Sequence, residues 1–264
     1  MLAWIVESIS GQAFHEFITA NIFIRLGMNN SEYDNGQKII MHKANNYTRD
    51  YGELVRTPYV NDLFHIGAGG LVTNCDDLQR WYECLRKREI LSEQAYKIYF
   101  TENKNHYCYG LERYDEEGKI RYSHGGDFLG VSALTQYYFD EEICIIILAN
   151  TDTLNQYRFG NALAAIMHGD RPQISCKPKE LFIPPDELEQ YTGTYLPGKI
   201  HIEEKSGKLY LVRVNQNIHI ELYCVGTHQF MRWYEEQEKP HELIPKGDTI
   251  PSVWGYERIS KQLV

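Results

Sequence analysis

The sequence has 264 residues, of which 43% are hydrophobic and 24% are charged, and its formal net charge is -9. This is ordinary globular composition, and the length suits one large or two small domains. The acidic balance excludes nucleic acid as an expected partner, because phosphate binding needs a basic face. The longest apolar run, 143–149, is too short to span a bilayer, and no basic segment of the signal-peptide type opens the chain.

Cysteines and histidines give no metal signature. The cysteines include no C-x-x-C pair and no H-E-x-x-H motif occurs, so we expect no metal and no cofactor. Cys84 and Cys144 lie among apolar residues and are predicted to be buried free thiols. The spacing of the cysteines does not require disulfides, although it is compatible with them.

The first part of the chain predicts helices on either side of an irregular segment. Apolar residues follow helical spacing from residue 2 up to Gly11, and a second helix follows and stops at Gly27. Residues 29–66 lack helical periodicity, and such segments often border binding clefts. Beyond them, Thr73 and Asn74 are candidate caps of one further helix, and Ser92 is the candidate cap of the next.

Apolar residues then recur at every second position, which predicts strands near 107–113, 119–124, 130–139 and 142–150. The separators are 115–118, the pair Gly125-Gly126, and 140–142. The apolar strand within 143–149 is expected to be buried on both faces. After a helix over about 157–167 and a proline-punctuated linker, short strands from 188 onward predict a small all-β barrel or sandwich.

The pair Gly125-Gly126 directly follows His124. Glycines on a strand let a backbone or a ligand approach closely, and a histidine supplies a proton or a hydrogen bond at neutral pH. On these residues alone, a bulge or hairpin corner explains the pair more simply than a binding site does.

The order of several motifs is more specific than any one of them. It runs through 7–14, 22–28, 67–78, 109–111, 124–126 and 145–150. This series resembles the serine β-lactamase-like family, which includes class C β-lactamases, penicillin-binding DD-peptidases, D-aminopeptidases and related esterases. The resemblance covers about residues 1–168, and the tail resembles the lipocalin-like β-barrel that some members carry.

The resemblance implies an α+β chain with two domains. Residues 1–170 would form part of a β-lactamase/DD-peptidase-like fold, an antiparallel sheet with helices. Residues 171–185 would be a linker, and 186–264 would form the small all-β barrel. The relatives are mostly exported or membrane-associated, and the sequence itself carries no signal for either location.

The resemblance also implies roles for the histidine and the glycines. His124, Gly125 and Gly126 would be the family's third motif, Lys-Thr-Gly or His-x-Gly, on a strand that flanks the active site. His124 would orient the substrate and help proton relay, the glycines would line the site, and the backbone N–H of Asp127 would be one arm of the oxyanion hole. The expected substrate is a small molecule or peptide: a D-amino-acid peptide, a β-lactam or a small ester.

Two motifs of that family are missing. No serine is followed by lysine three residues later, so Ser-x-x-Lys is absent. Tyr-x-Asn should precede the first helix, whereas the two letter matches, Tyr33-Asp34-Asn35 and Tyr59-Val60-Asn61, lie downstream of it.

We therefore expect the C-terminal portion of a longer serine hydrolase, inactive alone. The strand within 142–150 would then have an open edge and would support a homo-oligomer. The alternative is a non-catalytic ligand- or peptide-binding protein derived from the same fold.

Overall fold

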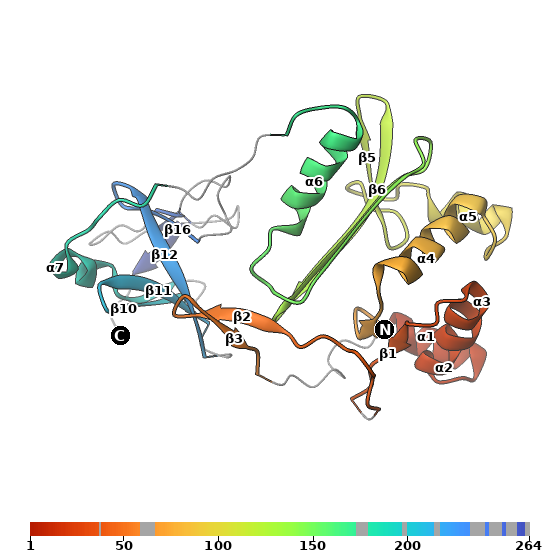
Figure 1. The fold of residues 1–264 in the computed structure, drawn as a ribbon, viewed down its shortest axis with the longest axis horizontal. Helices are drawn as coiled ribbons and strands as arrows, with labels where there is room; N and C mark the ends of the chain where they lie inside the picture. The colour runs from red at the N-terminus through yellow and green to blue at the C-terminus, as the bar shows by residue number, and fades with distance from the viewer. Residues whose placement is uncertain are drawn as a thin grey trace. The chain divides into compact units, whose positions relative to one another are not determined.

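The computed structural model describes residues 1–36, 38–58, 67–172, 179–196, 200–213, 217–232, 241–242, 250–251 and 258–261. The chain divides into two compact units. Unit 1 comprises Met1–Asn46, Tyr59–Asp152 and Gln156–Pro172, and unit 2 comprises Tyr47–Pro58, Thr153–Asn155 and Gln173–Val264. Unit 1 combines helices with an antiparallel sheet, as the sequence predicts (Figure 1).

Glycines end the N-terminal helices of unit 1. Gly11 and Gly27 have φ angles of 70° and 66°, in the left-handed region that glycine adopts without strain. Both predicted helix ends are thus confirmed. The helical segments in chain order are α1 (Leu2–Ser10), α2 (Phe14–Ile18), a π-helical segment (Thr19–Phe23) and α3 (Ile24–Leu26).

Side-chain caps start the next two helices, α4 (Cys75–Lys87) and α5 (Glu93–Tyr99). The Asn74 side chain accepts a hydrogen bond from the Asp77 N–H at 2.9 Å, and the Ser92 hydroxyl accepts one from the Ala95 N–H at 3.2 Å. Asn74 and Ser92 are thus confirmed as caps, whereas Thr73 precedes the cap position. Each cap satisfies a helix N–H that would otherwise lack a partner.

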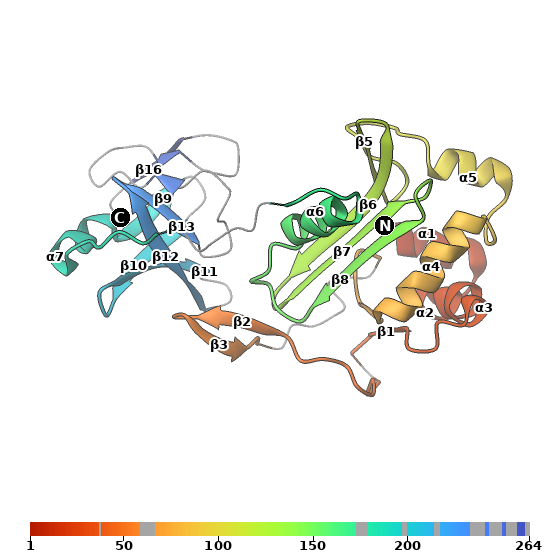
Figure 2. The same ribbon diagram turned by 45° about the horizontal axis from the view of Figure 1, so that its top comes forward.

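The sheet of unit 1 has the strand order β5-β6-β7-β8, with every neighbouring pair antiparallel. Helix α6 (Gln156–Met167) covers one face, and α4 lies on the other (Figure 2). On the α4 side, Tyr82, Tyr96 and Tyr137 belong to one buried cluster. The strands are β5 (Glu112–Glu116), β6 (Lys119–Phe128), β7 (Val131–Tyr138) and β8 (Ile143–Ala149).

Three strand predictions are wrong. The glycine pair does not separate two strands, because it lies inside β6, and the turn is at Leu129-Gly130 instead. The predicted strand over 107–113 begins only at Glu112: Tyr107 forms isolated bridges, and residues 108–111 lie in no strand, with Gly110 at a φ of 83°. Strand β8 is not buried on both faces: Leu148 is 39% exposed, since β8 ends the sheet in the described part of unit 1.

Unit 2 contains a sheet in the order β14-β13-β12-β11-β10-β9-β16-β15. Leu209, Leu222 and Phe230 lie in its buried core, together with Leu188 of α7 (Pro185–Leu188). No pairing closes the sheet among the described residues, so the lipocalin-like barrel stays a prediction. The strands are β9 (Gly193–Leu196), β10 (Ile200–Lys205), β11 (Lys208–Arg213), β12 (Ile218–Gly226), β13 (Gln229–Arg232), β14 (His241–Glu242), β15 (Ile250–Pro251) and β16 (Arg258–Lys261).

The irregular segment 29–66 contains pairings that the sequence did not predict. Strand β1 (Glu32–Tyr33) pairs with β4 (Leu71–Val72) in unit 1. Strands β2 (Tyr47–Asp50) and β3 (Glu53–Arg56) form a hairpin that belongs to unit 2. None of the helices in the described ranges is both long and apolar enough to cross a membrane.

The predicted thiols are free. Cys84 is buried and Cys144 is partly buried, and burial raises the pKa of the Cys144 thiol to about 12. A raised pKa keeps this sulfur in the unreactive thiol form at neutral pH.

Candidate active site

Strand β6 presents His124 and Gly126 on one face of the sheet and Gly125 and Asp127 on the other, because side chains alternate along a strand. Gly125 and Asp127 lie on the α6 side, where Gln156 donates a 2.7 Å hydrogen bond to the Asp127 carboxylate. His124 and Gly126 share the opposite face. The structure thus brings the four predicted site residues together on one strand but divides their side chains between two faces.

The two glycines meet different surroundings. A Cβ at Gly125 would lie 2.4 Å from the hydroxyl oxygen of Tyr157, the second residue of α6. A Cβ at Gly126 would meet no heavy atom within 4 Å. Gly125 is therefore required by packing within the chain, whereas the open space is at Gly126, beside the exposed His124.

The turn after β6 determines which of its backbone groups face outward. Leu129-Gly130 is a two-residue turn, so the flanking pair Phe128 and Val131 is a hydrogen-bonded pair. Bonded and non-bonded pairs alternate along antiparallel strands. The N–H and C=O groups of Gly125 and Asp127 therefore point away from β7.

The pairing of β5 supports the same assignment. Its last partner on β6 is Ser123, which is opposite Glu112. The backbone N–H and C=O groups of Ser123 point the same way as those of Gly125 and Asp127, because these are alternate residues of one strand. The groups of Ser123 must point toward β5 to make this pair. Beyond Ser123, β6 has β7 as its only strand neighbour in the described part of the sheet. Gly125 and Asp127 thus present backbone donors along an open edge.

Among the residues that the structure describes, the His124 side chain has one partner at this edge. Its Nε2 atom lies 3.0 Å from the hydroxyl oxygen of Tyr107. Sequence reasoning missed Tyr107 because it assigned 107–113 to a strand. Asn105 was the available signal, since asparagine tolerates the left-handed conformation of a tight turn.

The Tyr-x-Asn matches do not join this site. Asp34 of the first match is buried and forms an ion pair with Lys43. Burial raises the pKa of the Asp34 carboxyl, but Lys43 and the Gly36 N–H together hold it below its ordinary value. This carboxylate is engaged within its own loop. The second match, Tyr59-Val60-Asn61, lies outside the described residues.

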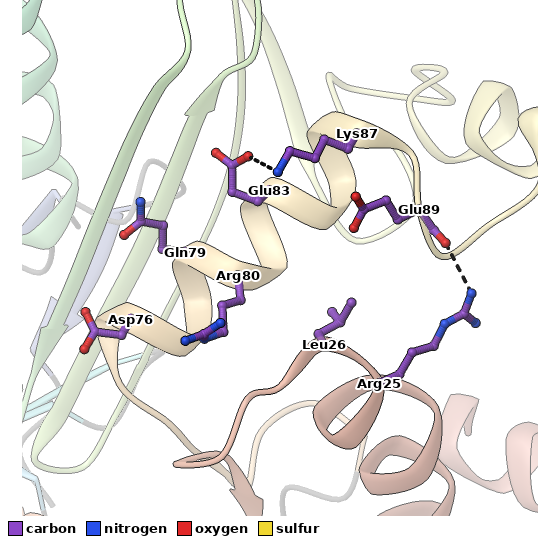
Figure 3. Close-up of a pocket in the computed structure, with 8 residues that line it drawn as sticks. All are labelled: Arg25, Leu26, Asp76, Gln79, Arg80, Glu83, Lys87 and Glu89. Atoms are coloured by element: carbon purple, nitrogen blue, oxygen red, sulfur yellow. Dashed lines mark hydrogen bonds and ion pairs between the residues drawn. The ribbon is translucent and has the colours of Figure 1, made fainter.

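A groove of about 570 Å³ lies between α3 and α4 and is lined by side chains of both charges (Figure 3). Within it Lys87 pairs with Glu83 at 3.1 Å, and Arg25 donates to the backbone oxygen of Glu89 at 3.2 Å. No lining residue belongs to β6. We therefore separate this mixed-charge groove from the candidate active site.

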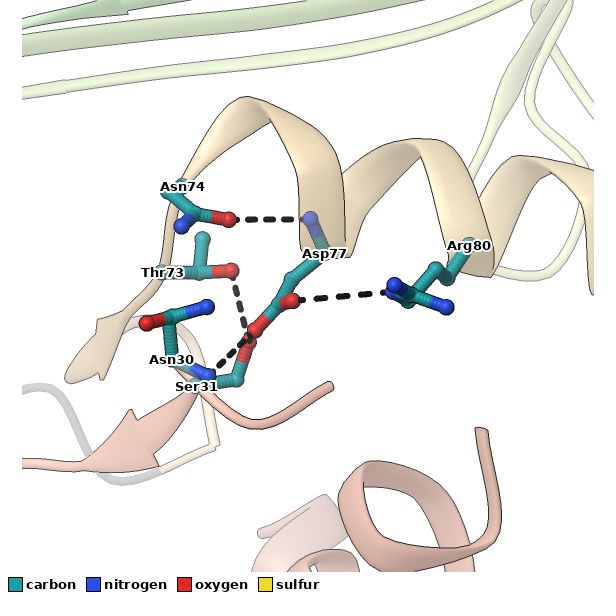
Figure 4. Close-up of polar contacts among 6 residues, drawn as sticks. All are labelled: Asn30, Ser31, Thr73, Asn74, Asp77 and Arg80. Atoms are coloured by element: carbon teal, nitrogen blue, oxygen red, sulfur yellow. Dashed lines mark hydrogen bonds and ion pairs between the residues drawn. The ribbon is translucent and has the colours of Figure 1, made fainter. Parts of the chain in front are cut away.

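A buried carboxylate fixes the start of α4 (Figure 4). Asp77 accepts hydrogen bonds from the Asn30 N–H at 2.7 Å and from the Ser31 hydroxyl at 2.8 Å. The Ser31 oxygen lies 2.7 Å from the Thr73 hydroxyl, so Thr73 donates to Ser31. Because all these groups are satisfied by one another, the cluster is structural. Within the described ranges, no three His, Cys, Asp or Glu side chains form a group that could hold a metal ion.

Unit 1 has the arrangement of sheet and helices that the beta-lactamase-like fold shows. The family model described as beta-lactamase matches residues 1–168, and the chain belongs to that beta-lactamase/penicillin-binding-like family. The chain is 28% identical over 258 residues to penicillin-binding protein 4* of Bacillus subtilis. The matched region covers 87% of this chain and 57% of that protein.

Solved structures share the fold at lower identity. The octameric penicillin-binding protein homologue from Pyrococcus abyssi has a TM-score of 0.55 and 21% identity, covering 98% of this chain and 63% of that one. A D-stereospecific amidohydrolase from Streptomyces has a TM-score of 0.51 and 19% identity, covering 57% and 47%. The chain thus spans less than two thirds of the length of each of these proteins.

Proposed function

We propose that this chain carries the substrate-aligning strand of a serine hydrolase of the β-lactamase/penicillin-binding type. Such an enzyme transfers an acyl group from a D-amino-acid peptide, a β-lactam or an ester to a serine and then to water. The observation that carries the proposal is the open edge of β6, where the outward N–H groups of Gly125 and Asp127 lie beside the exposed imidazole of His124.

Each residue has a distinct part in this function. An extended substrate would pair with the unpaired backbone of β6, as edge strands allow. The open space at Gly126 would admit the substrate, and His124 would align it. The N–H of Asp127 would stabilise the negative charge of the tetrahedral intermediate. Gly125 would act through its backbone alone, because Tyr157 occupies the space at its Cα.

Peptide binding tests this assignment. N-acetyl-D-alanyl-D-alanine should shift the amide resonances of residues 124–127. Gly126→Val should abolish these shifts, since its side chain would fill space that is open in the fold. Lys119→Ala, at the other end of β6, is the matched control and should bind as the unaltered chain does. A peptide that leaves the β6 amides unmoved, or that binds the valine variant equally well, would contradict the proposal.

Acylation needs a nucleophile that the printed sequence does not provide as Ser-x-x-Lys. We propose that these 264 residues alone form no acyl-enzyme. Incubation with a fluorescent penicillin or a fluorophosphonate, followed by intact-mass measurement, should show no adduct. A labelled serine would overturn this part of the proposal.

The same missing motif favours a second candidate, a non-catalytic ligand- or peptide-binding protein derived from this fold. Translating the DNA upstream of Met1 separates the two. An in-frame Ser-x-x-Lys followed by Tyr-x-Asn supports the hydrolase, and a stop codon followed by a ribosome site at Met1 supports the binding protein.

We also propose self-association through β8, which has β7 as its only strand neighbour in the described sheet. An unpaired strand edge with exposed apolar side chains such as Leu148 favours pairing with another copy. Light scattering should therefore show an oligomer that Leu148→Lys weakens, and a monodisperse monomer would refute this. The domain assignment, 1–170 as the hydrolase part, 171–185 as linker and 186–264 as a lipocalin-like barrel, remains part of the proposal.

A further inference from the structure

We propose that Tyr107 is a positioning residue that fixes both the direction and the tautomer of the His124 imidazole. The substrate-aligning role of that imidazole rests on the proposed function, whereas its contact with Tyr107 is seen in the structure. Tyr107 lies outside the motif that contains His124, on a different segment of the chain. The two side chains meet at the point where the open edge of β6 begins.

The contact determines which ring nitrogen carries the proton. The Tyr107 hydroxyl lies 3.0 Å from Nε2 of His124, and the two rings meet edge to face at 71°. A phenol is a good donor and the unprotonated nitrogen of a neutral imidazole is a good acceptor. Donation from Tyr107 to Nε2 therefore leaves the proton on Nδ1. Among the described residues Nδ1 has no partner, so it is the nitrogen available to a ligand.

A tight turn holds Tyr107 in place. The Tyr107 N–H donates to the Lys104 oxygen at 3.0 Å, across Asn105 and His106. These two residues have φ angles of 52° and 62°, the left-handed values of a type I′ turn. The His106 ring stacks on Tyr114 at 5.3 Å. Asparagine adopts such values readily, and the contact with Tyr114 holds His106 in them, so the turn is a defined support.

Backbone pairing links this turn to the site. Tyr107 forms an antiparallel bridge with Glu112, and Glu112 pairs with Ser123 of β6. The residue after Ser123 is His124. The hydroxyl of Tyr107 is thus placed by the same strand pairs that end where the edge becomes open. An exposed histidine without such a link would exchange rotamers freely, whereas this one is held beside the outward N–H of Gly125.

Tautomer measurements test the proposal on the full chain. Long-range ¹H–¹⁵N spectra at about pH 8.5, roughly two units above the ordinary histidine pKa, report the protonated nitrogen. We expect the Nδ1–H form to predominate at His124. Tyr107→Phe should shift the tautomer ratio toward Nε2–H by a factor of about 2–10, the equivalent of one net hydrogen bond. Tyr109→Phe, which alters another exposed tyrosine of the same loop, should leave the ratio unchanged.

Two results would overturn the positioning role: a wild-type His124 protonated mainly on Nε2, or a ratio that Tyr107→Phe leaves unchanged. The first needs no variant, so the proposal is testable even if the substitution impairs folding. Titration with N-acetyl-D-alanyl-D-alanine separates it from the proposed function. If the peptide shifts the amides of 124–127 but Tyr107→Phe leaves the His124 tautomer ratio unchanged, only the role of Tyr107 is refuted. If Tyr107→Phe changes the tautomer ratio but the peptide shifts no amide of 124–127, the role of Tyr107 is supported and the proposed function is contradicted.

Discussion

Replacing Gly125 by alanine should destabilise unit 1, whereas the same change at Gly126 should not. A Cβ at Gly125 would lie 2.4 Å from the hydroxyl oxygen of Tyr157 and 2.6 and 3.0 Å from two of its ring carbons. The ring must move by roughly 1 Å to restore an ordinary contact of about 3.5 Å. Overpacking of this kind costs about 1–3 kcal/mol. Since Tyr157 is 40% exposed and can partly swing away, we expect the lower half of that range.

Hydrogen exchange of the β6 and β7 amides as a function of urea measures this cost within unit 1. Gly126→Ala should change stability by less than about 0.5 kcal/mol, because its Cβ meets nothing within 4 Å. In a Tyr157→Ala background, Gly125→Ala should lose most of its cost, since neighbouring substitutions are coupled. Equal costs at the two glycines, or an equal cost of Gly125→Ala in both backgrounds, would refute the reasoning.

Three further substitutions test contacts elsewhere in the two units. Asp77→Ala should cost about 1–3 kcal/mol in urea unfolding, because buried donors lose their acceptor. His219→Ala should speed exchange of the Tyr51 amide about tenfold or more, because the 2.8 Å contact of His219 with Asp50 joins the β2–β3 hairpin to β12. The depressed pKa of Asp34 contributes stability above its unfolded pKa of about 3.9, which is lost as pH falls through the folded value. Asp34→Asn should therefore reduce the acid-side loss of stability in a pH series of melts.

Local sequence signals predicted the helices well, because caps and terminal glycines act within one turn of the chain. Asn74, Ser92 and Gly11 each do what their residue type favours. The sequence placed the strands of unit 1 approximately but misjudged their ends. A glycine pair usually breaks a strand, yet Gly125 pairs within β6. Its lack of a side chain leaves room for Tyr157, more than thirty positions later. No local pattern contains that information.

The partner of His124 was also beyond local reasoning. The contact with Tyr107 depends on a turn through Asn105 and on the pairing of β5 with β6, and both alter the assumed strand at 107–113. Asparagine was a usable turn signal, but the histidine that follows it in a left-handed conformation was not. Resemblance to a family located the motif, whereas only three-dimensional pairing showed what surrounds it.

Two alternations along an antiparallel strand, one of side chains and one of backbone groups, support the proposed role of this motif as a substrate-binding edge. Side chains alternate between the faces, and backbone groups alternate between the two neighbouring strand positions. At Gly125 and Asp127 the Cα positions face α6 while the N–H groups face the open edge. At His124 and Gly126 the backbone faces β7 and the open face is left for a ligand. Packing of α6 therefore fixes the residues whose N–H groups would meet developing charge, and donors held rigid in advance stabilise such charge best.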